Sequence, residues 1–435
     1  MKLNYKRTIL IGFAFLSICA FWQFYDNEIP KILKYSFGLG ETATGVVMAL
    51  DNVFALFLLP LFGNLSDKTD CRIGKRMPYI LIGTVLSVSL LYALIAVARE
   101  SGNLLMFMFG LLFILFAMGI YRSPAVSLMP DLTPAPLRSS GNAIINLMGT
   151  VGGIFVLVMT KVMLKEADDP AKTDYMPFVI SIIICMVLSV GVLFFTLNEK
   201  KIKKEIEDQG GLKSFAEELE KEVSENKDKS SMPPEVKRSL IFLLVSVFFW
   251  YTAYNAVTTA FSRFVGEVWN LHNNDYATCL LVATVAATLS YIPIAYISAR
   301  IGRKKTILAG ILLMGASFII TGFYPHFSFS INAFFAFVGI GWAAINVNSY
   351  PMVVEMCKAD EIGKYTGMYY TFSMAAQVFT PVFSGYLLEH ISYKTLFPYS
   401  FIFSGLAFAT MLMVKHGDTR PCKKGSILEN FDVDD

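Results

Sequence analysis

The chain has 435 residues, of which 55% are apolar and 16% are charged, with a mean hydropathy of +0.54. Soluble domains carry about 25% charged residues because their surface must stay wet, so this composition excludes an ordinary soluble protein. The net charge of +3 is too small to indicate a nucleic-acid partner. The six cysteines are scattered without a Cys-x-x-Cys pair, which predicts free thiols and no metal site.

Apolar stretches of transmembrane length recur along the whole chain. A bilayer core about 30 Å thick needs roughly 20 apolar residues per helix, and this criterion predicts twelve spans. Their expected limits are 8–29, 41–64, 79–97, 104–128, 140–163, 176–197, 239–262, 276–298, 306–324, 329–353, 366–389 and 396–414. Basic residues precede the first stretch as in a signal peptide, but its apolar run is long enough to predict a retained helix.

The longest polar insertion divides the spans six and six. It is rich in Lys and Glu and ends in Pro233-Pro234, which predicts an amphipathic helix at the membrane surface followed by a flexible tether. The expected organisation is an N-terminal six-helix bundle at 1–198, a cytoplasmic linker at 199–237, a C-terminal six-helix bundle at 238–415 and a tail at 416–435.

The basic residues predict the orientation. Most of the 37 Lys and Arg residues fall in the two termini, the linker and the loops on the same side as these. The positive-inside rule then predicts cytoplasmic N- and C-termini in a multi-pass protein of the cell membrane.

Corresponding loops of the two halves echo each other. Residues 63–76 follow the second span and contain Asp67, Gly74 and the basic pair Lys75-Arg76, while residues 295–305 follow the eighth span and contain Gly302 and four bases. The second copy is shorter and has lost the acid. This pattern indicates a parallel duplication of a six-helix unit.

The first of these loops carries a family resemblance. Its ending, Gly74-Lys-Arg-Met-Pro-Tyr79, resembles the loop between helices 2 and 3 of the major facilitator superfamily, and more narrowly that of the glycoside-pentoside-hexuronide:cation symporters. The sequences around Asp51-Asn52, Pro60, Arg122-Ser-Pro, Met129-Pro-Asp131 and Arg138-Ser-Ser-Gly are most similar to the sucrose-transporter branch. The resemblance weakens in the C-terminal half. It implies an all-α membrane protein with twelve transmembrane helices in two pseudo-symmetric six-helix bundles.

Asp67 lies among four bases at a predicted helix end. A carboxylate there can bridge to basic residues and to the N-terminus of a neighbouring helix, which would make a charge latch that opens during transport. Alternatively, these charges only set the topology. The candidate residues of this cytoplasmic gate motif are Gly63, Asp67, Lys68, Gly74, Lys75, Arg76, Asp131 and Arg138.

Four polar residues within or near the predicted spans are candidates for proton coupling or substrate binding. Asp51 lies twelve residues before Gly63, about 18 Å into the membrane, where an acid is costly. It either couples protons or binds sugar hydroxyls, or it is a structural acid tied to Asn52 or to a neighbouring helix. Arg122 either pairs with Asp51, donates to a sugar or snorkels to the inner interface. Asp26 is expected near the outer surface, in a binding vestibule or at a hydrated helix end.

Aromatic and amide residues recur at helical spacing on several spans. Sugars present apolar CH faces and hydroxyls, so rings beside amides suit them; interfacial belts and helix packing produce similar patterns. The substrate-binding candidates are Trp22, Gln23, Trp250, Tyr254, Asn255, Asn346 and Gln377.

The resemblance also bears on the coupling ion. Melibiose-type members carry two carboxylates before the helix-2 proline as part of a sodium site, and the matching positions here are Ala55 and Leu59. This departure favours a proton, with no cofactor and no metal.

The sequence therefore predicts a proton-coupled symporter of a disaccharide or glycoside such as sucrose or maltose, working by alternating access. It is expected to be monomeric, with a small sugar and the lipid bilayer as its partners. An exporter of drugs or metabolites is the alternative, and a non-transporting sensor or scaffold a remote one. HExxH, nucleophile-elbow and Walker motifs are absent from the sequence, so an enzyme is not expected.

Overall fold

The computed structural model describes residues 4–133, 137–164, 170–208, 233–271, 275–357 and 362–418. The first half contains α1 (Tyr5–Tyr35), α2 (Glu41–Lys68), α3 (Met77–Ala93), α4 (Leu104–Asp131), α5 (Arg138–Met163), α6 (Met176–Thr196) and α7 (Glu199–Asp208). The second contains α9 (Pro234–Trp269), α10 (Asp275–Ile301), α11 (Arg303–Gly322), α12 (Ile331–Glu355), α13 (Ile362–His390) and α14 (Leu396–Leu412). A π-helical segment, Leu94–Arg99, extends α3.

Among the described residues, eleven helices are long and apolar enough to cross a membrane. They coincide with every span expected from the sequence except 366–389, which falls in α13. That helix has 29 residues and therefore the required length, but Tyr, Thr, Ser and Gln side chains lower its apolar content. The predicted linker helix falls on the ten residues of α7, and residues 209–232 of the linker lie outside the described part.

Several helices run further than their apolar cores predict. The first span was expected at 8–29, whereas α1 has 31 residues and ends at Tyr35. The seventh was expected at 239–262, whereas α9 has 36 residues, about 54 Å of helix. Hydropathy marks only the part of a helix that lies in hydrocarbon, while backbone hydrogen bonding continues into the interface.

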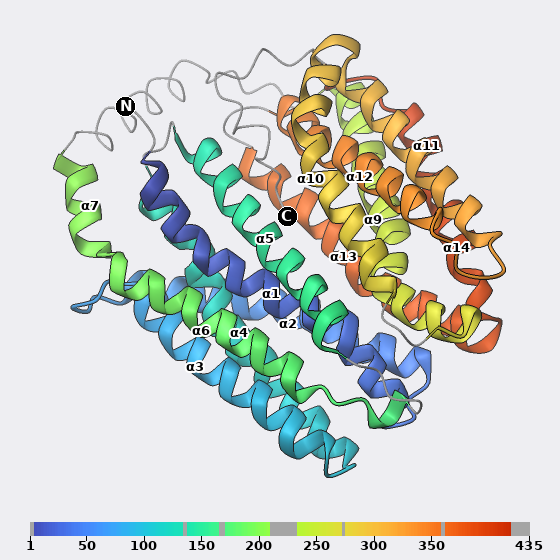
Figure 1. Cartoon of the computed structure of the whole chain (residues 1–435). Helices are drawn as coiled ribbons and strands as arrows, with labels where there is room; N and C mark the ends of the chain where they lie inside the picture. Colours follow the sequence, from blue (N-terminus) through green and yellow to red (C-terminus); the bar gives the residue numbers. More distant parts are fainter. Residues whose placement is uncertain are drawn as a thin grey trace. The chain divides into compact units, whose positions relative to one another are not determined.

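The described chain forms two compact units. The first contains α1, α3, α4, α5 and α6 together with α2 from Leu50 onward, and the second contains α9 to α14. The segment Gly40–Ala49, which contains the first residues of α2, belongs to the second unit. In Figure 1 the long helices of each unit lie side by side, blue to green in the first and yellow to red in the second.

The two units use the same helix pairs. In the first unit α1 packs on α5 and α6, and α3 packs on α4 and α6; in the second, α9 packs on α13 and α14, and α11 packs on α12 and α14. The pair α2 and α4, joined by the edge-to-face rings of Phe62 and Phe116, has its counterpart in α10 and α12. This correspondence supports the duplication that the loops indicated.

Small residues bring the paired helices close together. A Cβ at Gly152 would lie 2.2 Å from the carbonyl oxygen of Leu16, where α5 crosses α1. A Cβ at Gly339 would lie 2.0 Å from the carbonyl oxygen of Ala283, where α12 crosses α10. Close backbone approach of this kind replaces the hydrophobic driving force that is missing between helices in lipid.

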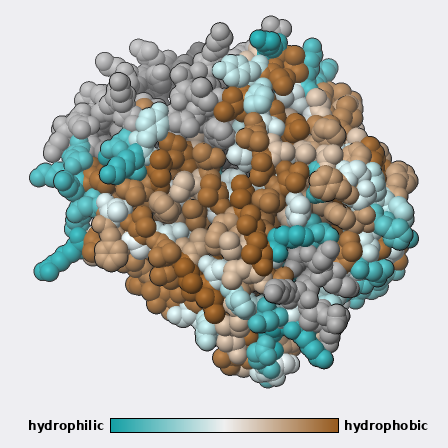
Figure 2. Space-filling model, viewed as in Figure 1, coloured by the Kyte–Doolittle hydropathy of each residue, from teal (hydrophilic) through white to brown (hydrophobic). Residues whose placement is uncertain are grey.

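The surface is that of a protein solvated by lipid. Figure 2 shows apolar side chains over most of the visible face and hydrophilic ones gathered toward its margins. Large apolar residues such as Phe195, Leu289 and Phe113 are 84%, 71% and 60% exposed. Exposed apolar area of this extent would aggregate in water, so the helices must cross a bilayer.

Candidate functional site

Three charged side chains from α1, α2 and α4 form a polar cluster inside the first unit. Asp26 interacts electrostatically with Asp51 and with Arg122, and Asp51 also interacts with Arg122. All three side chains are partly exposed rather than fully buried. Three charges that converge from three membrane-crossing helices are costly in hydrocarbon, so their conjunction indicates a polar binding site.

The placement of Asp26 corrects the expectation of a hydrated helix end. Helix α1 continues for nine residues beyond Asp26, about 13 Å. Glu28 and Lys31, which follow Asp26, are both buried and form an ion pair at 3.4 Å. Because this pair neutralises its own charge, the helix passes through the polar stretch without ending.

Asp51 is held by its neighbour. The backbone N–H and the side-chain Nδ2 of Asn52 both donate to Oδ1 of Asp51, at 2.6 and 2.8 Å. Within the described residues, the other carboxylate oxygen accepts no hydrogen bond. Asn52 therefore orients the carboxylate and leaves one oxygen open to a ligand or a proton.

Arg122 points toward α1. Its guanidinium lies 5.5 Å from the centre of the Trp22 ring, a cation–π distance. Trp22 lies seventeen residues into α1, about 25 Å from its start, so this contact gives no support to an arginine that snorkels to the interface. Gln23, the next residue, turns toward α5, where its Oε1 lies 3.4 Å from the Cβ position of Gly153.

Two buried donors beside this cluster have no hydrogen-bond partner in the described part of the chain. They are the indole N–H of Trp22 and the hydroxyl of Tyr25, whose rings meet edge to face at 5.3 Å. An unsatisfied buried polar group costs about 1–3 kcal/mol. Such groups beside a charged cluster are suited to water or to the oxygens of a ligand.

An aromatic group lies inside the second unit. The rings of Tyr254 on α9 and Trp342 on α12 are stacked at 3.8 Å and are nearly parallel, with an angle of 6°. Tyr251 meets Trp342 edge to face at 5.1 Å. Near these rings in sequence, Asn255 and the buried Asn346 each keep a buried amide atom without a partner in the described chain.

Two other candidates of the second unit stand apart from this group. Trp250 is fully buried in the protein, so its ring fills the unit's interior and offers no surface to a substrate. Gln377 on α13 is partly exposed, and within the described residues no hydrogen bond joins it to the aromatic group.

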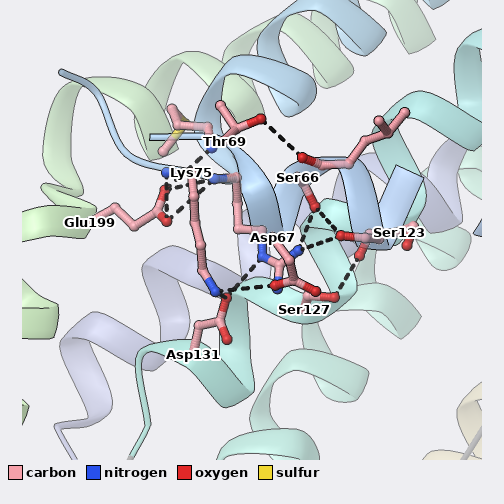
Figure 3. A network of polar contacts seen from close by, with 12 residues as sticks. Ser66, Asp67, Thr69, Lys75, Ser123, Ser127, Asp131 and Glu199 are labelled. Carbon is pink, nitrogen blue, oxygen red and sulfur yellow. Dashed lines mark hydrogen bonds and ion pairs between the residues drawn. The ribbon is translucent and has the colours of Figure 1, made fainter. Parts of the chain in front are cut away.

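The loop after α2 forms an ion network within the first unit (Figure 3). Arg76 pairs with Asp67, and its Nε donates to Oδ2 of Asp131 at 2.8 Å. Lys75 reaches the same two carboxylates, at 3.3 Å for Asp67 and 3.0 Å for Asp131. Arg76 also donates to Ser66 and to the carbonyl oxygen of Gly63, so one guanidinium joins the end of α2 to the end of α4.

Some gate-motif candidates do not join this network. In the part of the chain that the structure describes, the candidate Lys68 is exposed and forms no ion pair, and the same holds for Arg72, another of the four bases near Asp67. The side chain of Arg138 lies outside the described residues. Of the four bases near Asp67 in the sequence, only Lys75 and Arg76 therefore belong to the described network.

Glu199, at the start of α7, is the member of this network that sequence reasoning missed. Its carboxylate accepts the backbone N–H groups of Lys75, Arg76 and Met77 at 3.0, 3.1 and 3.3 Å (Figure 3). It thus caps the N-terminus of α3, where a negative charge is favoured. The sequence predicted that Asp67 would cap a neighbouring helix in this way. Instead, Asp67 lies at the C-terminal end of α2 and pairs with Lys75 and Arg76.

The second unit repeats this arrangement with other residues. Arg303, at the start of α11, pairs with Glu355 at the end of α12, as Arg76 pairs with Asp131. Asp418, which follows α14, accepts the backbone N–H of Lys304 at 2.7 Å and so caps α11 as Glu199 caps α3. The acid equivalent to Asp67 is indeed missing from the second loop, but Glu355 and Asp418 supply carboxylates from distant positions.

Two units of six membrane-length helices, each with an ion network at one end and a polar or aromatic group inside, define a polytopic helical membrane protein. The chain belongs to the family of MFS/sugar transport proteins, whose model matches residues 11–414. That family is one of transport proteins and not of enzymes.

Curated relatives match only parts of the chain. A putative metabolite transport protein of Haemophilus influenzae is 26% identical over 158 residues, and a lactose permease of Lactobacillus helveticus is 38% identical over 74 residues. These matches cover 35% and 16% of this chain, and 34% and 12% of the relatives' own lengths.

Solved structures share the fold over nearly the whole chain. The nucleoside transporter NupG superposes with a TM-score of 0.66 at 16% identity, covering 95% of this chain and 100% of that one. The inward-open xylose transporter XylE of E. coli also gives 0.66 at 16% identity, with 98% of each chain covered. At such low identity the likeness establishes the fold and leaves the substrate open.

Proposed function

We propose that the protein is a proton-coupled symporter of a sugar, a disaccharide or glycoside such as sucrose or maltose. It works as a monomer by alternating access in the cell membrane, with both termini in the cytoplasm. The family of sugar transport proteins and the stretch similar to a lactose permease support the substrate class. The resemblance of the first loop to the sucrose-transporter branch supports it further.

The polar cluster in the first unit carries the proposal. It contains two acids, Asp26 and Asp51, and one base, Arg122, so it bears a net negative charge when all three are ionised. One bound proton makes the cluster neutral, and neutrality lowers the cost of holding it in the membrane. Proton binding from one side and release to the other then accompanies the passage of the substrate.

The same cluster offers hydrogen bonds to hydroxyl groups. Arg122 supplies a planar fork of donors, while Trp22 and Tyr25 supply two buried donors without partners in the described chain. Carboxylate oxygens accept from sugar hydroxyls. In the second unit, the stacked rings of Tyr254 and Trp342 suit the apolar face of a sugar ring.

A proton is favoured over sodium as the coupling ion. Sodium prefers several oxygen ligands, and the helix-2 positions that carry carboxylates in melibiose-type members are Ala55 and Leu59 here. A carboxylate such as Asp51 needs no further ligands to bind a proton.

An exporter of apolar drugs or other metabolites is the alternative within the same fold. The similarity to a putative metabolite transport protein leaves that class open. An apolar cargo would leave the net negative charge of Asp26, Asp51 and Arg122 without a polar partner, which disfavours it. A thermal-shift screen of the purified protein with sugars and hydrophobic amines separates the two: only sugars should raise the melting temperature.

The decisive experiment is uptake by proteoliposomes. Labelled sucrose, maltose and lactose, with uridine for comparison, are offered with an imposed proton gradient, with and without a protonophore. We expect accumulation of at least one sugar that the protonophore abolishes. The Asp51→Asn variant should lose accumulation but keep sugar exchange, whereas Asp70→Asn in the exposed loop should behave as the wild type. Accumulation without a gradient, or by Asp51→Asn, would refute proton coupling.

A further inference from the structure

Helix α7 begins at a boundary of the membrane, and its lysines take no part in the proposed transport. The membrane-crossing helix α6 ends at Thr196, and Leu197 is extended, with φ −106° and ψ 117°. Asn198 then starts α7 by accepting the backbone N–H of Lys201 at 3.0 Å. Glu199, the first residue of α7, caps the beginning of the membrane-crossing helix α3. The start of α7 is therefore held level with the end of α6 and the beginning of α3.

The second half of α7 lies near the beginning of α1. Glu205 on α7 interacts electrostatically with Arg7, in the first turn of α1. Figure 1 shows α7 turning away from the line of α6 at the end of the unit where α1 begins. All of these residues belong to the first unit. Because α1, α3 and α6 all cross the membrane, α7 lies at the depth of the lipid headgroups on one side of it.

Four exposed lysines cover one face of α7, namely Lys200, Lys201, Lys203 and Lys204. The first and the last of these are four residues apart and so lie on the same side of the helix. The opposite face carries the buried Glu199 and the half-buried Ile202. Lys200 pairs with the exposed Asp70 at 2.6 Å, whereas Lys201 and Lys204 form no ion pair within the described residues. A basic face turned away from the protein at headgroup depth attracts anionic lipids.

Arg7 provides an independent indication of an anionic ligand. Its Nε atom is buried and has no hydrogen-bond partner in the described part of the chain. A buried donor without a partner is costly, and the planar fork of a guanidinium matches the oxygens of a phosphate. Glu205 offsets part of the charge of Arg7 but, among the described contacts, accepts no hydrogen bond from it. Arg7 therefore keeps a donor for a ligand at the same level as the lysines of α7.

Apolar side chains are exposed beside these bases. Phe195, in the last turn of α6, is 84% exposed, and Ile9, two residues after Arg7 on α1, is 43% exposed. Because α6 and α1 run from this level into the membrane, Phe195 and Ile9 lie where the acyl chains of lipids begin. A molecule that carries both a phosphate and acyl chains can contact the bases and these apolar side chains together, which a free phosphate cannot.

We propose that Arg7 and the lysine face of α7 bind the headgroup of an anionic phospholipid, such as phosphatidylglycerol. The phosphodiester oxygens accept hydrogen bonds from Arg7, and the lysines add attraction for the negative charge. The acyl chains lie against the exposed apolar side chains of α1 and α6. A bound lipid thus fastens α7 to the membrane surface, in addition to the contact of Glu199 with α3. The site requires neither a particular sugar nor a proton, so it is independent of the proposed function.

Photo-crosslinking locates the lipid on the full-length protein. The protein is reconstituted in phosphatidylcholine vesicles that contain a trace of either phosphatidylglycerol or phosphatidylcholine with a diazirine near the headgroup. Peptide mass spectrometry then counts cross-links to residues 4–9 and 195–205. The anionic probe should give about fivefold more cross-links there than the zwitterionic probe, or a larger excess. Unlabelled phosphatidylglycerol should compete with the anionic probe, whereas inorganic phosphate at the same concentration should not.

Matched variants test the individual residues. Arg7→Gln should lower the number of cross-links from the anionic probe about fivefold, and the double variant Lys201→Gln with Lys204→Gln should lower it by at least as much. The double variant Lys305→Gln with Lys415→Gln removes two exposed bases from the second unit. This control should change the number of cross-links less than about twofold.

Equal cross-linking by the anionic and the zwitterionic probe would overturn the proposal. Undiminished cross-linking in the lysine variant of α7 would do the same, and this variant decides the matter if Arg7→Gln fails to fold. Competition by inorganic phosphate as strong as that by phosphatidylglycerol, or an equal fall in the control variant, would also contradict a lipid site at α7. Because no sugar or proton gradient is present, failure of sugar uptake would leave the cross-linking result standing.

Discussion

The carboxylate of Glu199 accepts the backbone N–H of Arg76 at 3.1 Å, although the two residues lie 123 positions apart. This bond connects the chain just after the sixth helix to the start of the third. Arg76 in turn binds Asp67 and Asp131 through its side chain. One residue thus joins α2, α3, α4 and α7, and its backbone and its guanidinium have separate acidic partners.

The cap of α3 by Glu199 predicts a measurable stability loss. Glu199→Gln keeps the size of the side chain but removes the charge that faces three backbone N–H groups. Loss of a charged cap costs about 1–2 kcal/mol, so the melting temperature in detergent should fall. Glu205→Gln, an exposed change on the same helix, should leave it unaltered. An unchanged melting temperature for Glu199→Gln would mean that the cap of α3 needs no charge.

Substitution of Gly74 should lower the stability of the protein more than substitution of Glu199. Its φ is +114°, a conformation that L side chains rarely adopt, and a Cβ there would lie 2.1 Å from Oε2 of Glu199. Gly102 also has a positive φ, +65°, but has open space around its Cβ position. Gly102→Ala therefore measures backbone strain alone, about 1–2 kcal/mol. Gly74→Ala should lower the melting temperature by clearly more; an equal fall in both variants would contradict the contact with Glu199.

The loop network shows which part of this site could be predicted from the sequence. Asp67, Lys75, Arg76 and Asp131 lie within one resemblance and come together in the structure. Glu199 carried no local signal, since a single acid after a span is common in a linker rich in Lys and Glu.

The difference between the two units' arginines gives a third prediction. The guanidinium of Arg76 contacts Asp67, Asp131, Ser66 and Gly63, whereas within the described part of the chain the side chain of Arg303 contacts Glu355 alone. Lysine keeps the charge but loses the planar fork. Arg76→Lys should therefore lower the free energy of unfolding by roughly 1–2 kcal/mol more than Arg303→Lys does. The melting temperature should fall further in Arg76→Lys. Equal effects would show that charge alone matters at position 76.

The exposed pair of Asp70 and Lys200 predicts almost no effect. Their atoms lie 2.6 Å apart, and the hydrogen bond and charge of Lys200 lower the pKa of Asp70 from its usual value. At a pH above the ordinary Asp pKa of about 4, a lowered pKa stabilises the folded protein. This stabilisation is lost as the pH falls through the lowered pKa. Because both side chains are largely exposed, Asp70→Asn should leave the melting temperature at pH 7 unchanged within about 1 °C. A clear fall would mean that this pair anchors α7.

The membrane-embedded residues were harder to place than the helices that carry them. Span length follows from hydropathy, so most spans could be predicted to within a few residues. Asp26 was expected near a helix end because it lies nineteen residues after Arg7, whereas α1 is longer than one span requires and continues to Tyr35. The stacking of Tyr254 on Trp342 depends on how α9 and α12 meet, and helical periodicity within one span carries no information on that.

The charge balance of the polar cluster provides the last prediction. Arg122→Gln leaves Asp26 and Asp51 without the base that interacts with both, so repulsion between the acids is no longer offset. This variant should be less stable than the wild type at pH 7 and should regain stability as the pH is lowered, because protonation removes the repulsion. Adding Asp51→Asn to Arg122→Gln removes one acid and should restore most of the melting temperature. A double variant as unstable as Arg122→Gln would mean that Arg122 acts through its packing on Trp22. In that case the cluster would be held together by the ring contact, and the argument that it carries one exchangeable proton would fail.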